Sequence, residues 1–368
     1  MVIPFVDLRL QYESIQSEID QAVKEVFTQA QFIGGEPVVK FELQFSQVLG
    51  VKHCIGTGNG TDSLFLILKA LGIGPGDQVI TPAFSCMPSA ECITLAGATP
   101  VFADVDNDFY TIDPNQVAQK INSKTKAVIA VHLYGQAAPV SQLKTLCDRH
   151  GIYLIEDCAQ AHLSKDNTGF AGTFGIAAAF SFYPTKNLGA YGDAGCVVTQ
   201  QDDLAERVRR LANHGALKRN DHEMEGTNSR LDTLQAAILS AKLKHLHQWN
   251  EQRIILAQIY HTLLEGVEGI TLPAVRENSV HTFHIFAIRT KKRNALKSYL
   301  SDQGIETLIH YPEGLPFTNA YRFRNFSVGD FPVTAALQNE VLSLPIYPGL
   351  ASTDQALVAQ NVKNYFLG

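Results

Sequence analysis

Two short apolar runs decide the fold of this chain, residues 127–133 (AVIAVHL) and residues 152–157 (IYLIED). Each has the length of a strand, its apolar residues follow one another instead of alternating with polar ones, and a helical pattern at 140–150 separates the two. Strands of this kind with helices between them are typical of a mostly parallel sheet covered on both faces. The sequence therefore predicts an α/β fold with functional residues at the carboxyl ends of the strands.

The same alternation extends in both directions from these runs. Toward the N-terminus it is preceded by two amphipathic helical patterns, at 14–30 and 38–49. The remaining strands are predicted at 77–82, 100–105, 178–183 and 195–199, and the remaining helices at 62–71, 86–96 and 202–213.

A long helical pattern at 231–265 predicts a bridge to a smaller C-terminal domain. We place the boundary near residue 245, which gives a large domain at 1–245 and a small domain at 246–368. Beyond residue 273 the sequence predicts a strand (281–288), a helix (292–303), a strand (305–309) and a final helix (353–366), an α+β pattern. The turn-rich run 311–330 is interpreted as a loop that either lines a site or connects elements.

Composition excludes several classes of protein. The 368 residues are 45% hydrophobic and 18% charged, and a net charge of -6 without a run of Lys or Arg argues against a nucleic-acid or membrane-surface role. No stretch approaches the roughly 18 apolar residues of a membrane span, and the N-terminal residues do not resemble a secretion signal, so we expect a cytoplasmic protein. Six cysteines without a C-x-x-C pair predict free thiols and no metal site.

A glycine-rich segment, residues 56–62 (GTGNGTD), precedes the helical pattern at 62–71. Free backbone N–H groups and the positive end of the helix dipole at such a position can bind a phosphate. The spacing fits neither common phosphate-binding motif, so a glycine-rich turn with Asp62 as N-cap is the alternative.

Asp157 and Lys186 complete a pattern that suits one cofactor. Asp157 ends a strand and needs a cationic partner, which is either a protein group such as Arg or the protonated pyridine nitrogen of pyridoxal 5'-phosphate; a helix-capping role is the other alternative. Lys186 follows the apolar run 177–180 within the segment 181–189 (SFYPTKNLG), where desolvation would make its amine able to form a Schiff base. A surface lysine is the ordinary alternative, but together with the phosphate site the three positions match the phosphate, nitrogen and aldehyde of this cofactor.

The whole chain also resembles the DegT/DnrJ/EryC1/StrS family of sugar aminotransferases, within the aspartate aminotransferase fold type I. That fold has a large domain, in which a mostly parallel mixed sheet lies between helices, and a smaller α+β domain. The resemblance is carried by FVDLRLQY, FIGGEPVVKFE, GNGTDSL, GDQVITPAF, ATPVFADVD, AVHLYGQ, IEDCAQAH, SFYPTKNLGAYGDAG, TNSRLDTLQAAIL, IHYPEGLPF and LSLPIYPGL.

The resemblance implies a role for each residue of a cofactor site. Lys186 would carry pyridoxal 5'-phosphate as an internal aldimine, and Asp157 would bind its ring nitrogen. Phe84 would stack on the ring, although it is equally well interpreted as a core residue. The other implied contacts are Gln160 to the phenolic oxygen, Gly60, Thr61 and Ser181 to the phosphate, and Asn228 to the phosphate of the neighbouring subunit, which makes a homodimer the minimum functional unit.

The implied reaction is transamination from glutamate to a nucleotide-linked keto sugar. Lys186 would act as nucleophile and as general acid/base, and a lysine here favours transamination over the dehydration catalysed by family members with histidine. The segments AQAH and AYGDAG resemble those of enzymes that aminate a 3-keto sugar, so a dTDP-3-keto-6-deoxyhexose, giving a 3-amino-3,6-dideoxyhexose, is the predicted substrate. Alternatives are a UDP-linked 3-keto sugar, a 4-keto sugar, a free cyclitol ketone, and a catalytically silent binding or regulatory homologue.

Substrate contacts are predicted at fewer positions. His162 is either a ligand contact or a buried structural histidine. Lys218 and Arg219 are either a diphosphate site that reaches across the dimer or a solvated basic pair. The remaining candidates for contacts to the sugar are Tyr183, His310 and Tyr311.

Overall fold

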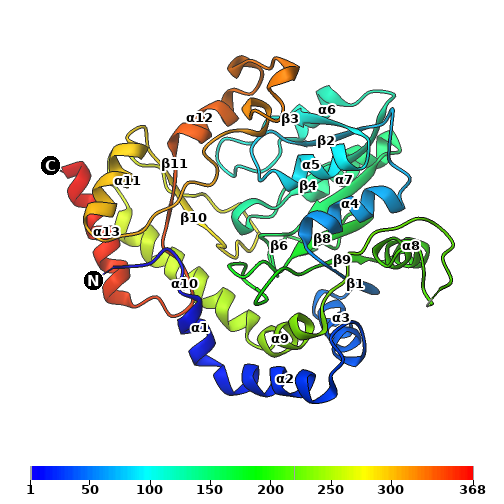
Figure 1. The fold of residues 1–368 in the computed structure, drawn as a ribbon. Coiled ribbons are helices and arrows are strands. Elements are labelled where there is room, and N and C mark those ends of the chain that lie inside the picture. The colour runs from blue at the N-terminus through cyan, green and yellow to red at the C-terminus, as the bar shows by residue number, and fades with distance from the viewer. Residues whose placement is uncertain (1, 219, 368) are drawn as a thin grey trace.

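The computed structural model describes residues 2–218 and 220–367 and has a central sheet between layers of helices (Figure 1). Seven strands form this sheet in the order β1, β9, β8, β5, β4, β2, β3. All are parallel except β9, which runs antiparallel to both of its neighbours. The strands are β1 (His53–Thr57), β2 (Gln78–Pro82), β3 (Thr99–Ala103), β4 (Thr125–Val131), β5 (Tyr153–Asp157), β8 (Ala177–Ser181) and β9 (Gly195–Thr199).

Both faces of the sheet are buried, which explains its continuous apolar strands. In β4, Ala127 and Ile129 point into the core under α4, α5 and α8, and Val128 and Ala130 point into the core under α6 and α7. Helices α3 and α9 cover the second face at β8 and β9. The bounds are α3 (Glu36–Leu49), α4 (Gly60–Ala70), α5 (Pro88–Leu95), α6 (Pro114–Lys120), α7 (Val140–His150), α8 (Asp202–Ala212) and α9 (Thr233–Leu243).

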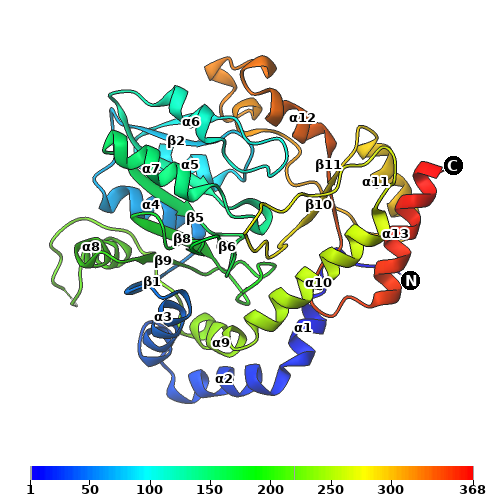
Figure 2. The same ribbon diagram turned by 180° about the vertical axis from the view of Figure 1, so that it is seen from behind.

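The C-terminal part of the chain packs around a core of its own, which also takes in Ile3 from the N-terminus. Figure 2 shows α10, α11 and α13 together at one side of the molecule, with α1 and α2 running from there along its base. The predicted boundary near residue 245 lies next to the start of α10 and remains a prediction. The elements are α1 (Leu8–Ser14), α2 (Gln16–Gln29), α10 (Leu246–Leu264), β10 (Phe286–Arg289), α11 (Arg293–Asp302), α12 (Pro332–Glu340), β11 (Val341–Leu344) and α13 (Ser352–Leu367).

The predicted fold class is confirmed, and several elements differ from the prediction. The helical pattern at 231–265 is two helices, because the chain turns between Leu243 and Leu246. The predicted strand 305–309 makes only isolated bridges, from Ile305 to Ile3 and from Leu308 to Ser343. The elements that were not predicted are strands β1, β6 (Lys165–Asp166), β7 (Gly169–Phe170) and β11 and helices α1, α6 and α12. None of the described helices combines the length and apolar character needed to cross a lipid bilayer.

Candidate active site

A cavity of about 520 Å³ opens at the carboxyl edge of the central sheet. Its walls come from the ends of the neighbouring parallel strands β2, β4, β5 and β8, from the start of α4 and from the C-terminal part of the chain. This is the edge at which α/β sheets bind their ligands. The cavity brings together eight residues predicted from the sequence: Gly60, Thr61, Asp157, Gln160, Ser181, Tyr183, Lys186 and Tyr311.

Lys186 lies in the loop 182–194 that joins β8 to β9. Its backbone N–H donates a hydrogen bond of 2.8 Å to the carbonyl of Tyr183, which closes a turn and turns the side chain into the cavity. Burial lowers the pKa of the Lys186 amine below its ordinary value, while Cys86 and Asp157 act in the opposite direction. A larger fraction of the amine is therefore in the neutral, nucleophilic form than for a lysine in water.

Asp157 ends β5 and is only 6% exposed. Its Oδ1 accepts a hydrogen bond of 3.0 Å from the N–H of Ala159. Burial raises the pKa of the Asp157 carboxyl, and the Ala159 N–H and the charge of Lys186 oppose this rise. Among the described residues Asp157 has no ion-pair partner. The Arg partner considered from the sequence is therefore not found there, and the carboxylate can take a cation from a ligand.

The start of α4 forms an anion site. Asn59 is its N-cap and accepts a 2.8 Å hydrogen bond from the N–H of Asp62, so Asp62 lies in the first turn and is not the N-cap considered from the sequence. The N–H groups of Gly60 and Thr61 find no acceptor within the described residues. A Cβ on Gly60 would lie 2.7 Å from the Cβ of Ser181, so only glycine lets α4 approach the end of β8 this closely. Free N–H groups at a helix start suit a phosphate.

Gln160 connects the sheet edge to the C-terminal part of the chain. Its Oε1 accepts a 2.7 Å hydrogen bond from the N–H of Tyr134, and its Nε2 donates one of 2.8 Å to the hydroxyl of Tyr311. Tyr134 in turn donates its hydroxyl proton to the carbonyl of His310. Gln160 thus holds Tyr311 in the cavity wall and keeps one amide hydrogen for a ligand.

His310, predicted as a sugar contact, does not line the cavity. Its Nδ1 lies 2.9 Å from the hydroxyl of Ser343. Burial, followed by the charge of Lys186, lowers the pKa of His310 to about 4. The ring is therefore neutral at physiological pH, and only its neighbour Tyr311 reaches the cavity wall.

Asn187, the residue after Lys186, is anchored on three sides and is 2% exposed. Its Nδ2 donates to Oδ1 of Asn250 on α10 (2.8 Å) and to the carbonyl of Thr282 (3.1 Å). Its Oδ1 lies 3.1 Å from Nδ1 of His284, which must carry the proton because an amide oxygen only accepts. These bonds fix the lysine loop against α10 and the segment that leads into β10.

A second anchor of this loop is Lys242 on α9, which is completely buried. Its Nζ donates to the carbonyl of Gly189 (2.8 Å) and to Oε1 of Gln11 (3.2 Å), and it lies 3.9 Å from the ring centroid of Tyr191. Burial lowers the pKa of Lys242 to about 7. Loop 182–194 is thus held by a neutral side chain, Asn187, and by a titratable one, Lys242.

Two residues proposed from the sequence as ligand contacts lie outside the cavity. Phe84 is 1% exposed and packs in the core under α4, with its ring edge-on to Tyr311 at a centroid distance of 6.3 Å. His162 is fully buried against the rings of Phe180 and Phe182, and burial together with the charge of Lys186 lowers its pKa to about 3. Neither ring has a face open to a ligand in the cavity, so the alternative interpretations, core and structural, describe their positions.

The predicted residues for the neighbouring subunit lie away from this cavity. Asn228 and Lys218 are exposed on the segment between α8 and α9, and neither lines the cavity. Arg219 lies outside the described residues. Within one chain the site is therefore built without this segment.

Comparison with known proteins identifies the family of this chain. The model of the DegT/DnrJ/EryC1/StrS aminotransferase family matches residues 13–363. The chain belongs to this family.

Relatives match this chain over nearly its full length. It is 42% identical over 366 residues to a dTDP-3-amino-3,6-dideoxy-alpha-D-galactopyranose transaminase of Aneurinibacillus thermoaerophilus, with 99% of each chain covered. It is 39% identical to a UDP-N-acetyl-3-dehydro-alpha-D-glucosamine 3-aminotransferase of Acidithiobacillus ferrooxidans, with 100% of this chain and 98% of the relative covered. The crystal structure of S. venezuelae DesV in complex with a ketimine intermediate superimposes with a TM-score of 0.97 at 40% identity, over 99% of this chain and 98% of that one.

Sequence reasoning missed part of the cavity wall of this aminotransferase. Ser85 and Cys86 follow β2, and Asp193 precedes β9; all three line the cavity. The rule that ligands bind at the carboxyl ends of parallel strands applies to β2 as it does to β5 and could have indicated the first two.

Near the cavity, the described residues hold one cluster with metal-ligand chemistry, His132, Glu156 and Cys158, all buried. Nε2 of His132 lies 3.0 Å from Glu156, and its Nδ1 accepts from the N–H of Ala138 (3.0 Å). Glu156 also accepts the N–H groups of Gly172, Phe174 and Gly175. These hydrogen bonds occupy both ring nitrogens and both carboxylate oxygens, so the cluster stabilises the end of β5 that carries Asp157.

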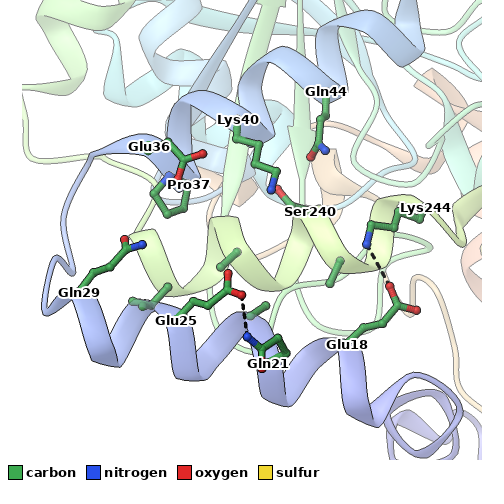
Figure 3. Close-up of a pocket in the computed structure, with 14 residues that line it drawn as sticks. Glu18, Gln21, Glu25, Gln29, Glu36, Pro37, Lys40, Gln44, Ser240 and Lys244 are labelled. Carbon is green, nitrogen blue, oxygen red and sulfur yellow. Dashed lines mark hydrogen bonds and ion pairs between the residues drawn. The ribbon is translucent and has the colours of Figure 1, made fainter.

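A second hollow of this aminotransferase lies between α2, α3 and α9, far from the lysine loop in sequence (Figure 3). It measures about 320 Å³, and two contacts join side chains that line it: Lys244 Nζ lies 3.1 Å from Glu18, and Gln21 donates a 2.7 Å hydrogen bond to Glu25. Its other charged side chains, Glu36 and Lys40, are exposed to solvent. It contains none of the residues predicted for the active site.

Proposed function

We propose that this chain is a pyridoxal 5'-phosphate-dependent aminotransferase that moves an amino group from glutamate to a dTDP-linked 3-keto-6-deoxyhexose. The observation that carries the proposal is the placement of Lys186 and Asp157, an amine with a lowered pKa and a buried carboxylate without an ion-pair partner, in one cavity at the start of α4.

The residues present fit this cofactor at three points. Asp157 suits the protonated ring nitrogen because burial leaves its charge in need of a cation. The N–H groups of Gly60 and Thr61 suit the phosphate. Lys186 suits the aldehyde. When bound, pyridoxal 5'-phosphate supplies an electron sink for the carbon that gains or loses the amino group.

The chain's own residues have separate tasks in this reaction. Lys186 is positioned by its turn to hold a proton at Nζ and return it, as general base and then general acid. Asp157 keeps the far end of the site negative. Gln160 orients Tyr311, and Tyr183 and Tyr311 form the wall available to the sugar.

The choice of a 3-keto sugar rests on the AYGDAG and AQAH segments and on the names of the relatives. A 3-amino dideoxyhexose transaminase that uses a dTDP sugar is 42% identical to this chain. A relative named for a UDP sugar is 39% identical, and it favours the same carbon with a different nucleotide. A UDP-linked 3-keto sugar is therefore the second candidate substrate.

A homodimer is part of the proposal, with Asn228 and Lys218 reaching the neighbouring subunit's site. Its support is an exposed apolar surface on α2, α3 and the turn between them, because large exposed apolar patches mark protein contacts. This surface consists of Phe27, Phe32, Ile33, Val39 and Leu43.

The test is turnover with matched keto sugars. We expect the protein loaded with pyridoxal 5'-phosphate to release 2-oxoglutarate from glutamate with the dTDP-linked 3-keto sugar, and more slowly with the UDP-linked one. Turnover of the 4-keto sugar alone would contradict the choice of carbon. Failure to show a visible absorption band after loading, with no borohydride-fixed label at Lys186, would contradict the cofactor.

A further inference from the structure

The cavity contains a thiol to which the reaction assigns no task. Of the six cysteines, all within the described residues, five are buried and only Cys86 is exposed. Cys86 lines the active-site cavity between β2 and α5. Its carbonyl accepts hydrogen bonds from the N–H (3.2 Å) and the hydroxyl (2.9 Å) of Ser89, which is fully buried. The backbone of Cys86 is therefore fixed against a buried residue.

Cys86 lines the same cavity as Lys186 and Asp157, the residues at the two ends of the proposed cofactor site. Although the Cys86 side chain is exposed to the cavity, the protein around it partly desolvates the thiol and raises its pKa; contact with the Tyr311 hydroxyl and the charge of Lys186 lower the pKa, and the charge of Asp157 raises it. The charges of the Lys186 amine and of the Asp157 carboxylate thus both act on the pKa of the thiol. Because burial dominates, Cys86 is a neutral thiol at physiological pH, and it is suited to contact a ligand rather than to attack one.

The neighbouring residue gives independent evidence that this wall binds something. Ser85 is 2% exposed and lines the cavity, and its hydroxyl has no hydrogen-bond partner among the described residues. Buried polar groups are nearly always paired in native proteins. An unpaired hydroxyl beside Cys86 therefore indicates that a ligand completes this wall.

Phe84 cannot take this task, because its ring is in the core. We propose that Cys86 covers one face of the ring of pyridoxal 5'-phosphate and that the bound cofactor shields its thiol. The proposal rests on the function proposed above. A thiol is a small, polarizable group that packs well against an aromatic ring but holds it less firmly than a stacked aromatic side chain does.

Thiol alkylation of the native protein tests the proposal. Iodoacetamide forms a bond between its carbon and the cysteine sulfur, iodide leaves, and the thiol proton passes to the buffer. In cofactor-free protein at mildly alkaline pH, which supplies some thiolate, we expect Cys86 to be labelled faster than the five buried cysteines, as located by peptide mass spectrometry. Loading with pyridoxal 5'-phosphate should slow this labelling about tenfold or more, while inorganic phosphate, which suits only the start of α4, should change it less than about twofold.

The outcomes separate the two proposals. Equal labelling of Cys86 with and without the cofactor, in protein whose visible band proves that it is loaded, would overturn the role of Cys86 and leave the function intact. Protein that shows no visible band under any condition would instead overturn the proposed function.

A pair of variants tests the assignment without alkylation. Cys86→Ala should raise the dissociation constant of the cofactor about threefold to tenfold and shift its visible absorption maximum. Phe84→Leu is the matched control, because it removes a ring from the core and should lower the melting temperature while leaving the dissociation constant within about twofold. The reverse pattern would return the ring contact to Phe84 and overturn the proposal.

Discussion

The active-site cavity and the hollow between α2, α3 and α9 are both lined by charged residues, yet they use charge differently. In the hollow, Lys244 and Glu18 neutralise each other 3.1 Å apart and both reach solvent. In the cavity, Asp157 is buried and Lys186 is half-buried, their pKa values move in opposite directions from the ordinary ones, and no ion pair joins them. The difference teaches that a binding site is marked by buried charges left without partners, which a ligand can complete.

Removal of Lys186 should give the largest effect. Lys186→Ala should lower turnover about 10⁴-fold or more and abolish the visible band of the loaded protein, since the variant lacks the amine that bonds the cofactor and moves the proton. Absorbance spectra and release of 2-oxoglutarate measure both effects. Lys244→Ala in the hollow is the control and should stay within about twofold of the parent. Comparable losses in the two variants would erase the distinction between the regions.

Neutralising Asp157 should have the next largest effect. Asp157→Asn keeps the size of the side chain but removes the charge, so we expect turnover to fall roughly 100-fold to 1,000-fold. The variant should also lose its cofactor more readily, which dialysis and absorbance measurements would detect. Glu18→Gln makes the same chemical change in the hollow and should alter neither reading. Full activity of Asp157→Asn would show that its buried charge has no functional partner.

Asn187 tests whether the cavity depends on its supports. Asn187→Ala removes the bonds to Asn250, Thr282 and His284 next to Lys186, and we expect kcat to fall about tenfold to 100-fold with the KM for glutamate nearly unchanged. Asn250→Ala loses one of these bonds without touching His284. It should lower the melting temperature but reduce kcat less than threefold. Equal kcat values in the two variants would leave Asn187 with a purely structural task.

The smallest effect concerns pH and Lys242. Its folded pKa of about 7 lies below the value in the unfolded chain, so the unfolded state binds more protons between these values and stability rises with pH there. Below pH 7, Lys242 is protonated in the folded state, and burying its charge lowers the unfolding free energy by the full amount. Above pH 7 the buried amine loses its proton, and this destabilisation decreases. From pH 7 to 9 we expect the parent to gain about 2 kcal/mol in unfolding free energy relative to Lys242→Met, measured by urea unfolding. A pH-independent difference would contradict the titration of Lys242.

The sequence predicted the parts of the molecule that local pattern controls. Six strands of the sheet were predicted to within a few residues, because burial on both faces gives uninterrupted apolar runs. Strand β1 was missed, since its five residues include His53 and Gly56 and its pairing depends on β9, distant in sequence. The break between α9 and α10 has no Gly or Pro to indicate it. Both are tertiary effects.

The candidate site follows the same division. Lys186 and Asp157 could be found because strand ends and charge are visible in the sequence. The direction of a side chain after a strand is not visible, so the sequence left Phe84 as either a ring contact or a core residue and did not indicate Cys86, two residues later, which lines the cavity. Likewise His162 follows β5 as Gln160 does, but it turns into the aromatic core.

The reversed strand β9 has one more consequence. Ser181 pairs with Gly195, so the loop 182–194 leaves and rejoins the sheet at the same point. In a connection that crosses to the far edge of a sheet, an extra residue can be accommodated along its length. In loop 182–194 both ends are held by the pairing of Ser181 with Gly195, so an extra residue before Lys186 would displace the lysine. It would move the chain about 3.3 Å, more than a reacting amine tolerates. The length of this loop is therefore as much a requirement of the enzyme as the lysine that it carries.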